Sequence, residues 1–109
     1  MTEIENFHAH VYYDAPDRAR AQKLCATAGK TFGIKVGRMH DNPVGPHPRG
    51  SCQLTIPKDQ FSTVVPWLML NRGALTVFTH AQTGNALKDH TDHAIWLGPS
   101  ETLNLSQFH

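Results

Sequence analysis

The segment from residue 80 to residue 96 reads HAQTGNALKDHTDHAIW and concentrates side chains that can do chemistry. His80, His90 and His93 stand there beside two aspartates and a Gly-Asn turn. An imidazole nitrogen can ligate a transition metal, and an imidazole whose pKa lies near neutrality can also move protons. A histidine in a loop more often only faces water, so the rest of the chain must decide between the two interpretations.

Histidine is frequent along the whole chain, with eight among 109 residues and no contiguous tag. Two or three histidines that leave coordination positions open are typical of a catalytic metal site, and imidazole suits Fe(II), Zn(II), Cu(II) and Ni(II). Each histidine could instead be a solvated or hydrogen-bonded side chain. The candidate ligands come from four segments: His8 with His10, then His47, then His80, then His90 with His93.

Three arginines are the cations best able to bind a carboxylate through two parallel hydrogen bonds, namely Arg38, Arg49 and Arg72. Arg49 follows His47 by two residues in a loop where Pro46 and Pro48 flank the imidazole. The prolines restrict the backbone and lower the entropy lost when a side chain is fixed onto a ligand. We therefore expect His47 in the metal site and Arg49 with Arg72 in substrate binding. A solvated surface is the alternative for the arginines.

Length, charge and cysteine usage narrow the class of protein. A chain of 109 residues can bury one core, so a single domain over residues 1–109 is expected. Ten basic and nine acidic residues give a net charge of +1, and no basic run is interleaved with aromatics, which argues against nucleic acid as a binding partner.

No apolar stretch approaches the roughly 20 residues of a membrane span, and the N-terminus does not resemble a signal peptide. We expect a cytoplasmic protein with no membrane partner. Cys25 and Cys52 form no CxxC motif and are expected to be small buried side chains.

Apolar periodicity predicts five strands and two helices. The strands are expected over residues 7–13, 34–39, 51–56, 74–79 and 94–97. Alternation in the first strand sends Phe7, Ala9, Val11 and Tyr13 to one face and His8, His10 and Tyr12 to a polar, wet face. Tyr12 is expected either to bond a substrate hydroxyl or to pack.

The first helix is expected to follow an Asp14 cap and to stop at Gly29. The second has apolar residues at helical spacing from Phe61 and ends between Asn71 and Gly73. Pro66 either lies in its first turn or kinks a longer helix. Residues 40–50, with three prolines, and the stretch that begins at residue 80 are expected to be loops.

The order strand, helix, strand, strand, helix, strand, strand predicts an α+β, ferredoxin-like (split βαβ) fold, in which both helices cover one face of an antiparallel sheet. The other face would remain uncovered, and a second copy would hide it most readily, so a homodimer is expected. The first strand would be central and beside the fourth. A central strand, a stiff loop and a neighbouring strand end would then bring together the three predicted metal ligands, His10, His47 and His80.

Several motifs in one order resemble the small DOPA 4,5-dioxygenase family: HVYYD at 10–14, GPHP at 45–48, LNRG at 70–73, and HxxTG with DHTxHAxW over 80–96. The resemblance covers nearly the whole chain. It implies extradiol cleavage of a catechol, such as DOPA or a related small aromatic diol, by O₂ and a non-haem metal in a ferredoxin-like fold. Fe(II) is the implied ion, and purified protein could also carry Zn(II).

The resemblance also bears on individual residues. The motif histidines of the family fall on His10, His47, His80, His90 and His93, whereas His8 precedes the matching pattern, so His10 is preferred to His8. The common extradiol set is two histidines and a carboxylate, which Asp89 or Asp92 could supply, and a three-histidine set is equally compatible. His80 is then a ligand, and His90 or His93 would take a catechol proton and return one later.

Two other functions remain open. The first is a non-enzymatic ferredoxin-like dimer that binds a small hydrophobic molecule on its sheet. The second is a zinc-dependent hydrolase, because zinc accepts the same imidazoles and could activate water.

Overall fold

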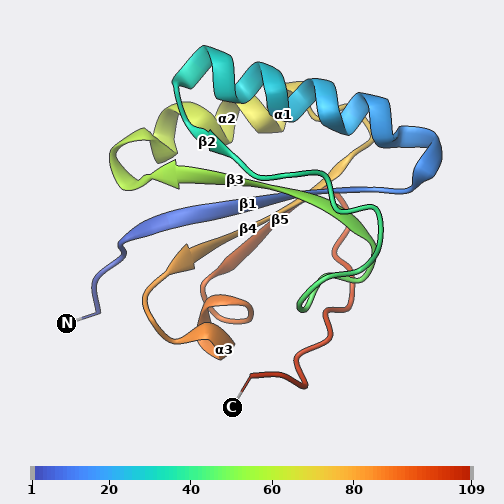
Figure 1. Ribbon diagram of the computed structural model, residues 1–109. Coiled ribbons are helices and arrows are strands. Elements are labelled where there is room, and N and C mark those ends of the chain that lie inside the picture. The colour runs from blue at the N-terminus through green and yellow to red at the C-terminus, as the bar shows by residue number, and fades with distance from the viewer. Residues whose placement is uncertain (1, 109) are drawn as a thin grey trace.

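The computed structural model describes residues 2–108, which form a five-stranded antiparallel sheet with two long helices on one face (Figure 1). The strands are β1 (Asn6–Tyr13), β2 (Lys35–Val36), β3 (Gly50–Pro57), β4 (Thr76–Gln82) and β5 (Ala94–Leu97). Their order in the sheet is β2-β3-β1-β4-β5, so β1 is central and pairs antiparallel with β3 and β4. The predicted α+β class, the five antiparallel strands and the place of β1 beside β4 are confirmed.

The long helices are α1 (Arg18–Phe32) and α2 (Phe61–Asn71), each preceded by a short 3₁₀ turn, η1 (Ala15–Asp17) and η2 (Lys58–Gln60). A third helix, α3 (Ala86–Asp89), lies in the stretch that was expected to be a loop. The side chain of Asn85 caps α3 by accepting a hydrogen bond from the Lys88 N–H at 3.1 Å. One helical turn is too short to show an apolar period, so the prediction missed it.

The expected boundaries of α1 are wrong at both ends. The side chain of Asp14 makes no capping hydrogen bond, and η1 intervenes before the helix begins. The helix passes Gly29 and ends at Gly33, whose φ of 65° is the left-handed conformation that glycine adopts without strain. A Cβ at Gly29 would lie 2.5 Å from Cγ2 of Val36, so this glycine serves the close packing of α1 on β2.

Three other elements differ from their expected form. The fourth strand was expected over residues 74–79, but β4 spans Thr76–Gln82 and so contains His80. Pro66 lies inside α2, beyond its first turn, so the placement in the first turn is wrong. The strand expected over residues 34–39 is reduced to the two residues of β2, followed by an isolated bridge between His40 and Ser51. Cys25 and Cys52 are buried free thiols, as predicted. Within residues 2–108, no helix has both the length and the apolar character needed to cross a membrane.

The apolar core lies between the sheet and the two long helices. Ala9, Val11 and Tyr13 of β1 belong to it, so the predicted division of this strand into two faces is correct. The opposite face is not wet, however, because His10 is only 5% exposed and Tyr12 is fully buried. The loop between β2 and β3, α3 and the C-terminal tail lie on that side of the sheet (Figure 1). The expectation of an uncovered face is therefore wrong, because irregular segments of the same chain cover its middle.

Candidate metal centre

Five imidazoles gather on the face of the sheet opposite α1 and α2. His8 and His10 lie on β1, and His80 lies on β4 directly opposite His8 in the strand register. His47 comes from the loop before β3, and its ring centroid is 4.0 Å from that of His10. His90 follows α3, and its ring centroid is 4.1 Å from that of His80. These five residues are called the histidine cluster below.

Three members of the cluster are close enough to share one ion. The ligand nitrogens of His8, His10 and His80 all lie within 4.8 Å of one another. Nε2 of His10 is 3.1 Å from Nε2 of His80, which matches the spacing of about 3.0–3.4 Å between adjacent ligands bound at ~2.1 Å. Three imidazoles at this spacing suit a divalent transition metal such as Fe(II) or Zn(II). Among residues 2–108, no carboxylate belongs to this group of three.

The structure thus brings together two of the three predicted ligands, His10 and His80. It sets His8 rather than His47 within ligand distance of both. The sequence contained the signal for His8, because residues two apart on a strand point to the same face. The prediction chose His10 instead of His8. In the structure the two histidines lie side by side, and both belong to the group of three.

Backbone carbonyls define the tautomers of two cluster histidines. Nδ1–H of His80 donates to the carbonyl oxygen of Ala81 at 3.0 Å, and Nδ1–H of His90 donates to that of Ala86 at 2.7 Å. Because a carbonyl oxygen only accepts, Nε2 of each neutral ring must carry the lone pair. His80 therefore presents an unprotonated nitrogen to His10, as a metal ligand requires. His90 keeps an Nε2 that can accept a proton.

Burial keeps most of the cluster uncharged. Loss of hydration, followed by repulsion from neighbouring imidazoles, lowers the pKa of His10 well below its ordinary value. Burial and then repulsion from His90 lower the pKa of His47 to about 4. Burial also lowers the pKa of His80 to about 4, despite the opposing hydrogen bond to Ala81. His8 shows a lowered pKa for the same main reason. Neutral imidazoles are the form that binds metal.

Tyr12 holds the loop histidine in place. Its hydroxyl lies 2.7 Å from Nδ1 of His47. Burial, followed by the charge of Glu101, raises the pKa of Tyr12 far above its ordinary value, so the hydroxyl keeps its proton and can donate it to His47. The Tyr12 ring is also 6.0 Å from that of Trp96. Of the two roles expected for Tyr12, the structure displays packing, together with a hydrogen bond to His47.

Arg49 lies beside the cluster with its charge compensated. Its Nε and Nη2 donate to the two carboxylate oxygens of Glu101 at 3.1 and 2.7 Å, and its Nη1 is 3.3 Å from Oδ2 of Asp14. A substrate carboxylate would have to exchange with one of these acids. Glu101 is 52 positions away in an irregular tail, so no local pattern could have indicated the pair.

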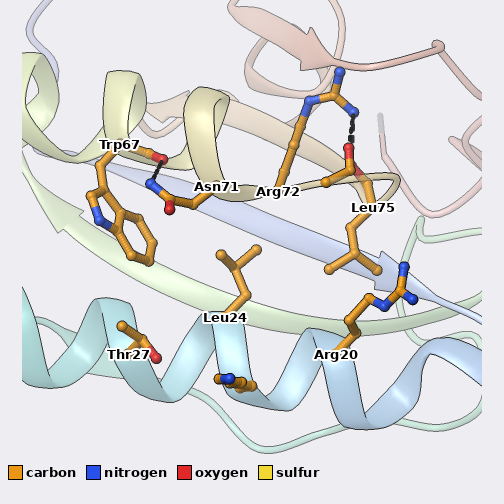
Figure 2. Close-up of a pocket in the computed structure, with 9 residues that line it drawn as sticks. Arg20, Leu24, Thr27, Trp67, Asn71, Arg72 and Leu75 are labelled. Atoms are coloured by element: carbon orange, nitrogen blue, oxygen red, sulfur yellow. Dashed lines mark hydrogen bonds between the residues drawn. The ribbon is translucent and has the colours of Figure 1, made fainter.

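Arg72, the other arginine expected to bind substrate, lies away from the histidine cluster. It follows α2, and its Nη1 donates to the carbonyl oxygen of Leu75 at 3.0 Å (Figure 2). A pocket of about 260 Å³ opens beside it between α1 and α2, with Leu24 and Trp67 in its lining. Arg72 therefore borders the helix layer near the start of β4, whereas His80 lies near the end of that strand on the other face.

His90 and His93 diverge although only two residues separate them. His93 immediately precedes β5, and its carbonyl oxygen accepts a hydrogen bond from Ala81 N–H at 3.0 Å. Its Nδ1 lies 2.9 Å from Oδ1 of Asp89. Its side chain borders a pocket with Phe7 and Ala81, whose side chains belong to the helix-covered face. The structure brings His90 to the cluster and leaves His93 outside it.

The two candidate acidic ligands also lie apart from the three grouped imidazoles. Asp89 is 2% exposed, and both of its oxygens accept hydrogen bonds from Thr83 or His93. Burial opposes ionisation of this carboxyl, but the hydrogen bonds outweigh burial and lower its pKa. Asp92 is exposed. The geometry of the described residues thus favours a three-histidine ligand set.

Comparisons with known proteins identify relatives of this chain. The chain is 32% identical to the DOPA 4,5-dioxygenase of Amanita muscaria over 96% of its own length and 50% of that protein. It is 31% identical to an uncharacterized 21.2 kDa protein of Botryotinia fuckeliana, over 92% of its length and 61% of that protein. The chain therefore spans about half to three fifths of the length of these two relatives.

A solved structure and a family model also match this chain. A crystal structure of a candidate dioxygenase from Nostoc punctiforme matches with a TM-score of 0.82 and 41% identity, covering 94% of this chain and 90% of that one. The model of the Dopa 4,5-dioxygenase family matches residues 7–107, a range that contains every member of the histidine cluster. On this match, the chain belongs to the Dopa 4,5-dioxygenase family.

Proposed function

We propose that this chain is a metal-dependent extradiol dioxygenase that opens the ring of a catechol, such as DOPA or a related small aromatic diol, with O₂ as co-substrate. The observation that carries the proposal is the group of three imidazole nitrogens within 4.8 Å of one another. Family membership adds the reaction class, because the Amanita muscaria relative is a DOPA 4,5-dioxygenase.

We propose His8, His10 and His80 as the ligands of the metal, with Fe(II) as the working ion and Zn(II) as an ion that purified protein can also carry. Fe(II) held by these three residues would supply the redox chemistry that lets electrons pass from the catechol to O₂. His47, the ligand expected from its loop, lies against His10 and is engaged by Tyr12. Metal content of His8→Ala and His47→Ala separates the two ligand sets, because only a lost ligand should lower it.

The remaining cluster residue would handle protons. Nε2 of His90 carries a lone pair, so His90 can accept the proton that a catechol loses and return it when the ring opens. Three aromatic side chains border this region, with the ring of Phe108 stacked on that of His90 at 4.6 Å and the ring of Phe78 4.5 Å from that of Trp96. The partly exposed rings of Trp96 and Phe108 also suit the packing of an aromatic substrate. We propose that Arg49 binds a substrate carboxylate in exchange for Glu101.

The test measures oxygen uptake by protein reloaded anaerobically with Fe(II). Each catechol, DOPA included, is added with ascorbate, and formation of a coloured product is followed together with O₂. We expect one O₂ consumed per catechol and both atoms of labelled O₂ in the product. A chelator should abolish uptake. Fully loaded protein that consumes no O₂ with any catechol would refute the proposal.

A second candidate function is a zinc hydrolase, which the three-histidine set without a carboxylate favours. Three histidines and one open position are an established arrangement for catalytic zinc, in which the ion activates water. Turnover that persists under strict anaerobiosis would support this function. Protein that binds small aromatic molecules but copurifies with no metal would instead support the non-enzymatic binding protein.

We also propose that the arrangement of the first four strands and the two long helices is ferredoxin-like, with β5 added at the edge beside β4, and that the chain forms a homodimer. The strand order β2-β3-β1-β4 and the two long helices on one face support the fold. The dimer is supported by two apolar side chains of α2, Met69 and Leu70, which are 55% and 84% exposed. Scattering at micromolar concentration measures the mass, and a monomer would contradict the dimer.

A further inference from the structure

We propose that Asp89, Thr83 and His93 form a positioning unit that holds His90 over His80, and that His93 acts only through Asp89 rather than as a proton donor to the substrate. The inference rests on the proposed role of His90 as the proton-transfer group. It assigns a role to three residues that lie outside the group of three proposed ligands.

The unit is built around one buried carboxylate. Oδ1 of Asp89 accepts hydrogen bonds from the Thr83 hydroxyl at 2.6 Å and from Nδ1–H of His93 at 2.9 Å. Oδ2 accepts from the backbone N–H of Thr83 at 2.8 Å. With the side chain only 2% exposed, water contributes little to its solvation. The three donors therefore define the position of the carboxylate.

The donors come from the two ends of the segment that carries His90. Thr83 directly follows β4, the strand of His80, and His93 directly precedes β5. Asp89 is the last residue of α3 and the chain neighbour of His90. One carboxylate thus joins the end of one strand, the end of the short helix and the start of the next strand. The carboxylate adds a link between these elements to the backbone hydrogen bonds within the turn and the ring contacts of His90.

The strand register explains why His93 cannot share the role of His90. His80 pairs with Ala94, and Ala81 bonds to the backbone of His93. Because side chains alternate along a strand, His93 and His80 point to opposite faces of the sheet. Nδ1 of His93 is engaged by Asp89, and its ring borders a pocket with Phe7 and Thr83. His93 therefore has a hydrogen-bonding role that does not require it to change its charge.

The first test compares His93→Asn with His93→Ala. An asparagine amide can donate a hydrogen bond to Asp89 but cannot titrate, so it separates positioning from proton transfer. We expect kcat of His93→Asn to stay within about threefold of wild type and kcat of His93→Ala to fall roughly tenfold, with KM and metal content unchanged in both. Equal impairment of the two variants, or a loss confined to His93→Asn, would overturn the inference.

The second test compares Asp89→Asn with Asp92→Asn, a matched control in the same turn. Asp92 is exposed and makes no side-chain hydrogen bond within residues 2–108. The readouts are amide hydrogen exchange over residues 83–93 and the ring resonances of His90, both of which are independent of turnover. We expect Asp89→Asn to accelerate exchange at least tenfold and to shift the His90 resonances, and Asp92→Asn to do neither.

The two tests separate this inference from the proposed function. If Asp89→Asn resembles Asp92→Asn in exchange and in the His90 resonances, the positioning unit is refuted even in an active enzyme. If wild-type protein consumes no O₂, the dioxygenase proposal fails, while faster exchange and shifted His90 resonances in Asp89→Asn would still establish what holds His90.

Discussion

The two faces of β1 show how one strand can bury two kinds of side chain. Ala9 and Val11 face α1 and α2 and are fully buried in the apolar core. His8 and His10 face the other way, where His10 is nearly as inaccessible, at 5% exposure. The first face is covered by regular helices and the second by a loop, a short helix and the tail (Figure 1).

Burial affects the stability of the fold in opposite ways on the two faces. Burial of apolar side chains removes them from water and stabilises the fold. Burial of the imidazoles removes their hydration, which costs free energy. Burial lowers the pKa of His80 and so keeps it neutral. Hydrogen bonds to Ala81, Ala86 and Tyr12 replace part of the lost hydration of His80, His90 and His47, respectively. The helix-covered face therefore supports stability, whereas the histidine face keeps unprotonated nitrogens close together at some cost in stability.

The largest expected effect comes from comparing one substitution on each face of β4. Replacing His80 with alanine removes one of the three proposed ligands, so we expect loss of metal loading and of catechol-dependent O₂ uptake, with a folded protein. Val77→Ala, on the other face of β4, should keep full metal content and lower the free energy of unfolding by roughly 1–3 kcal/mol. Metal analysis and denaturant unfolding of both variants measure the contrast. His80→Ala protein that retains metal would remove His80 from the ligand set.

A second variant tests whether metal binding and proton transfer depend on different histidines of the same face. His90→Ala should keep the metal, because the three grouped nitrogens are untouched, and should slow turnover by roughly 10² to 10⁴ through loss of proton transfer. Metal content and single-turnover rates are measured on the same sample. Loss of metal as complete as that of His80→Ala would make His90 a ligand.

Acid should destabilise the metal-free protein through the histidine face. The pKa of His80 is about 4 in the folded state, below the value near 6.5 of an unfolded chain, so the unfolded state binds more protons between these values. Stability is then fully present above pH ~6.5 and falls as the pH drops towards 4, by on the order of 3 kcal/mol for this group. Unfolding midpoints across this range test the slope, which His80→Gln should reduce. A flat profile would contradict burial of neutral imidazoles.

The smallest expected effect concerns the support of His47. Tyr12→Phe removes the hydroxyl that lies 2.7 Å from Nδ1 of His47 and leaves the ring in place. We expect a loss of about 1 kcal/mol in stability and a decrease of only a few-fold in kcat, with metal content unchanged. Tyr13→Phe is the control, because its hydroxyl bonds to Asp41 on the other side of the strand. Equal effects of both variants on kcat would mean that Tyr12 has no special relation to the cluster.

The sequence by itself determined the features that depend on periodicity and order. Alternation along residues 7–13 separated the histidines from the core side chains of β1, and β5 has the predicted boundaries of residues 94–97. The order of elements placed β1 beside β4 and so brought His10 near His80. These features are local, or follow from the few topologies available to such an order.

Only the tertiary structure decided the contacts made by irregular segments. Sequence spacing treated His90 and His93 as a pair, but the turn after α3 and the register of β5 send them to opposite sides of the sheet. The pairing of Arg49 with Glu101 and the stacking of Phe108 on His90 depend on a tail without periodicity. Gly29 continues α1 instead of ending it, and its missing side chain leaves room for Val36 of β2. Such contacts join distant residues through space, and no local pattern encodes them, because their geometry exists only once the sheet has formed.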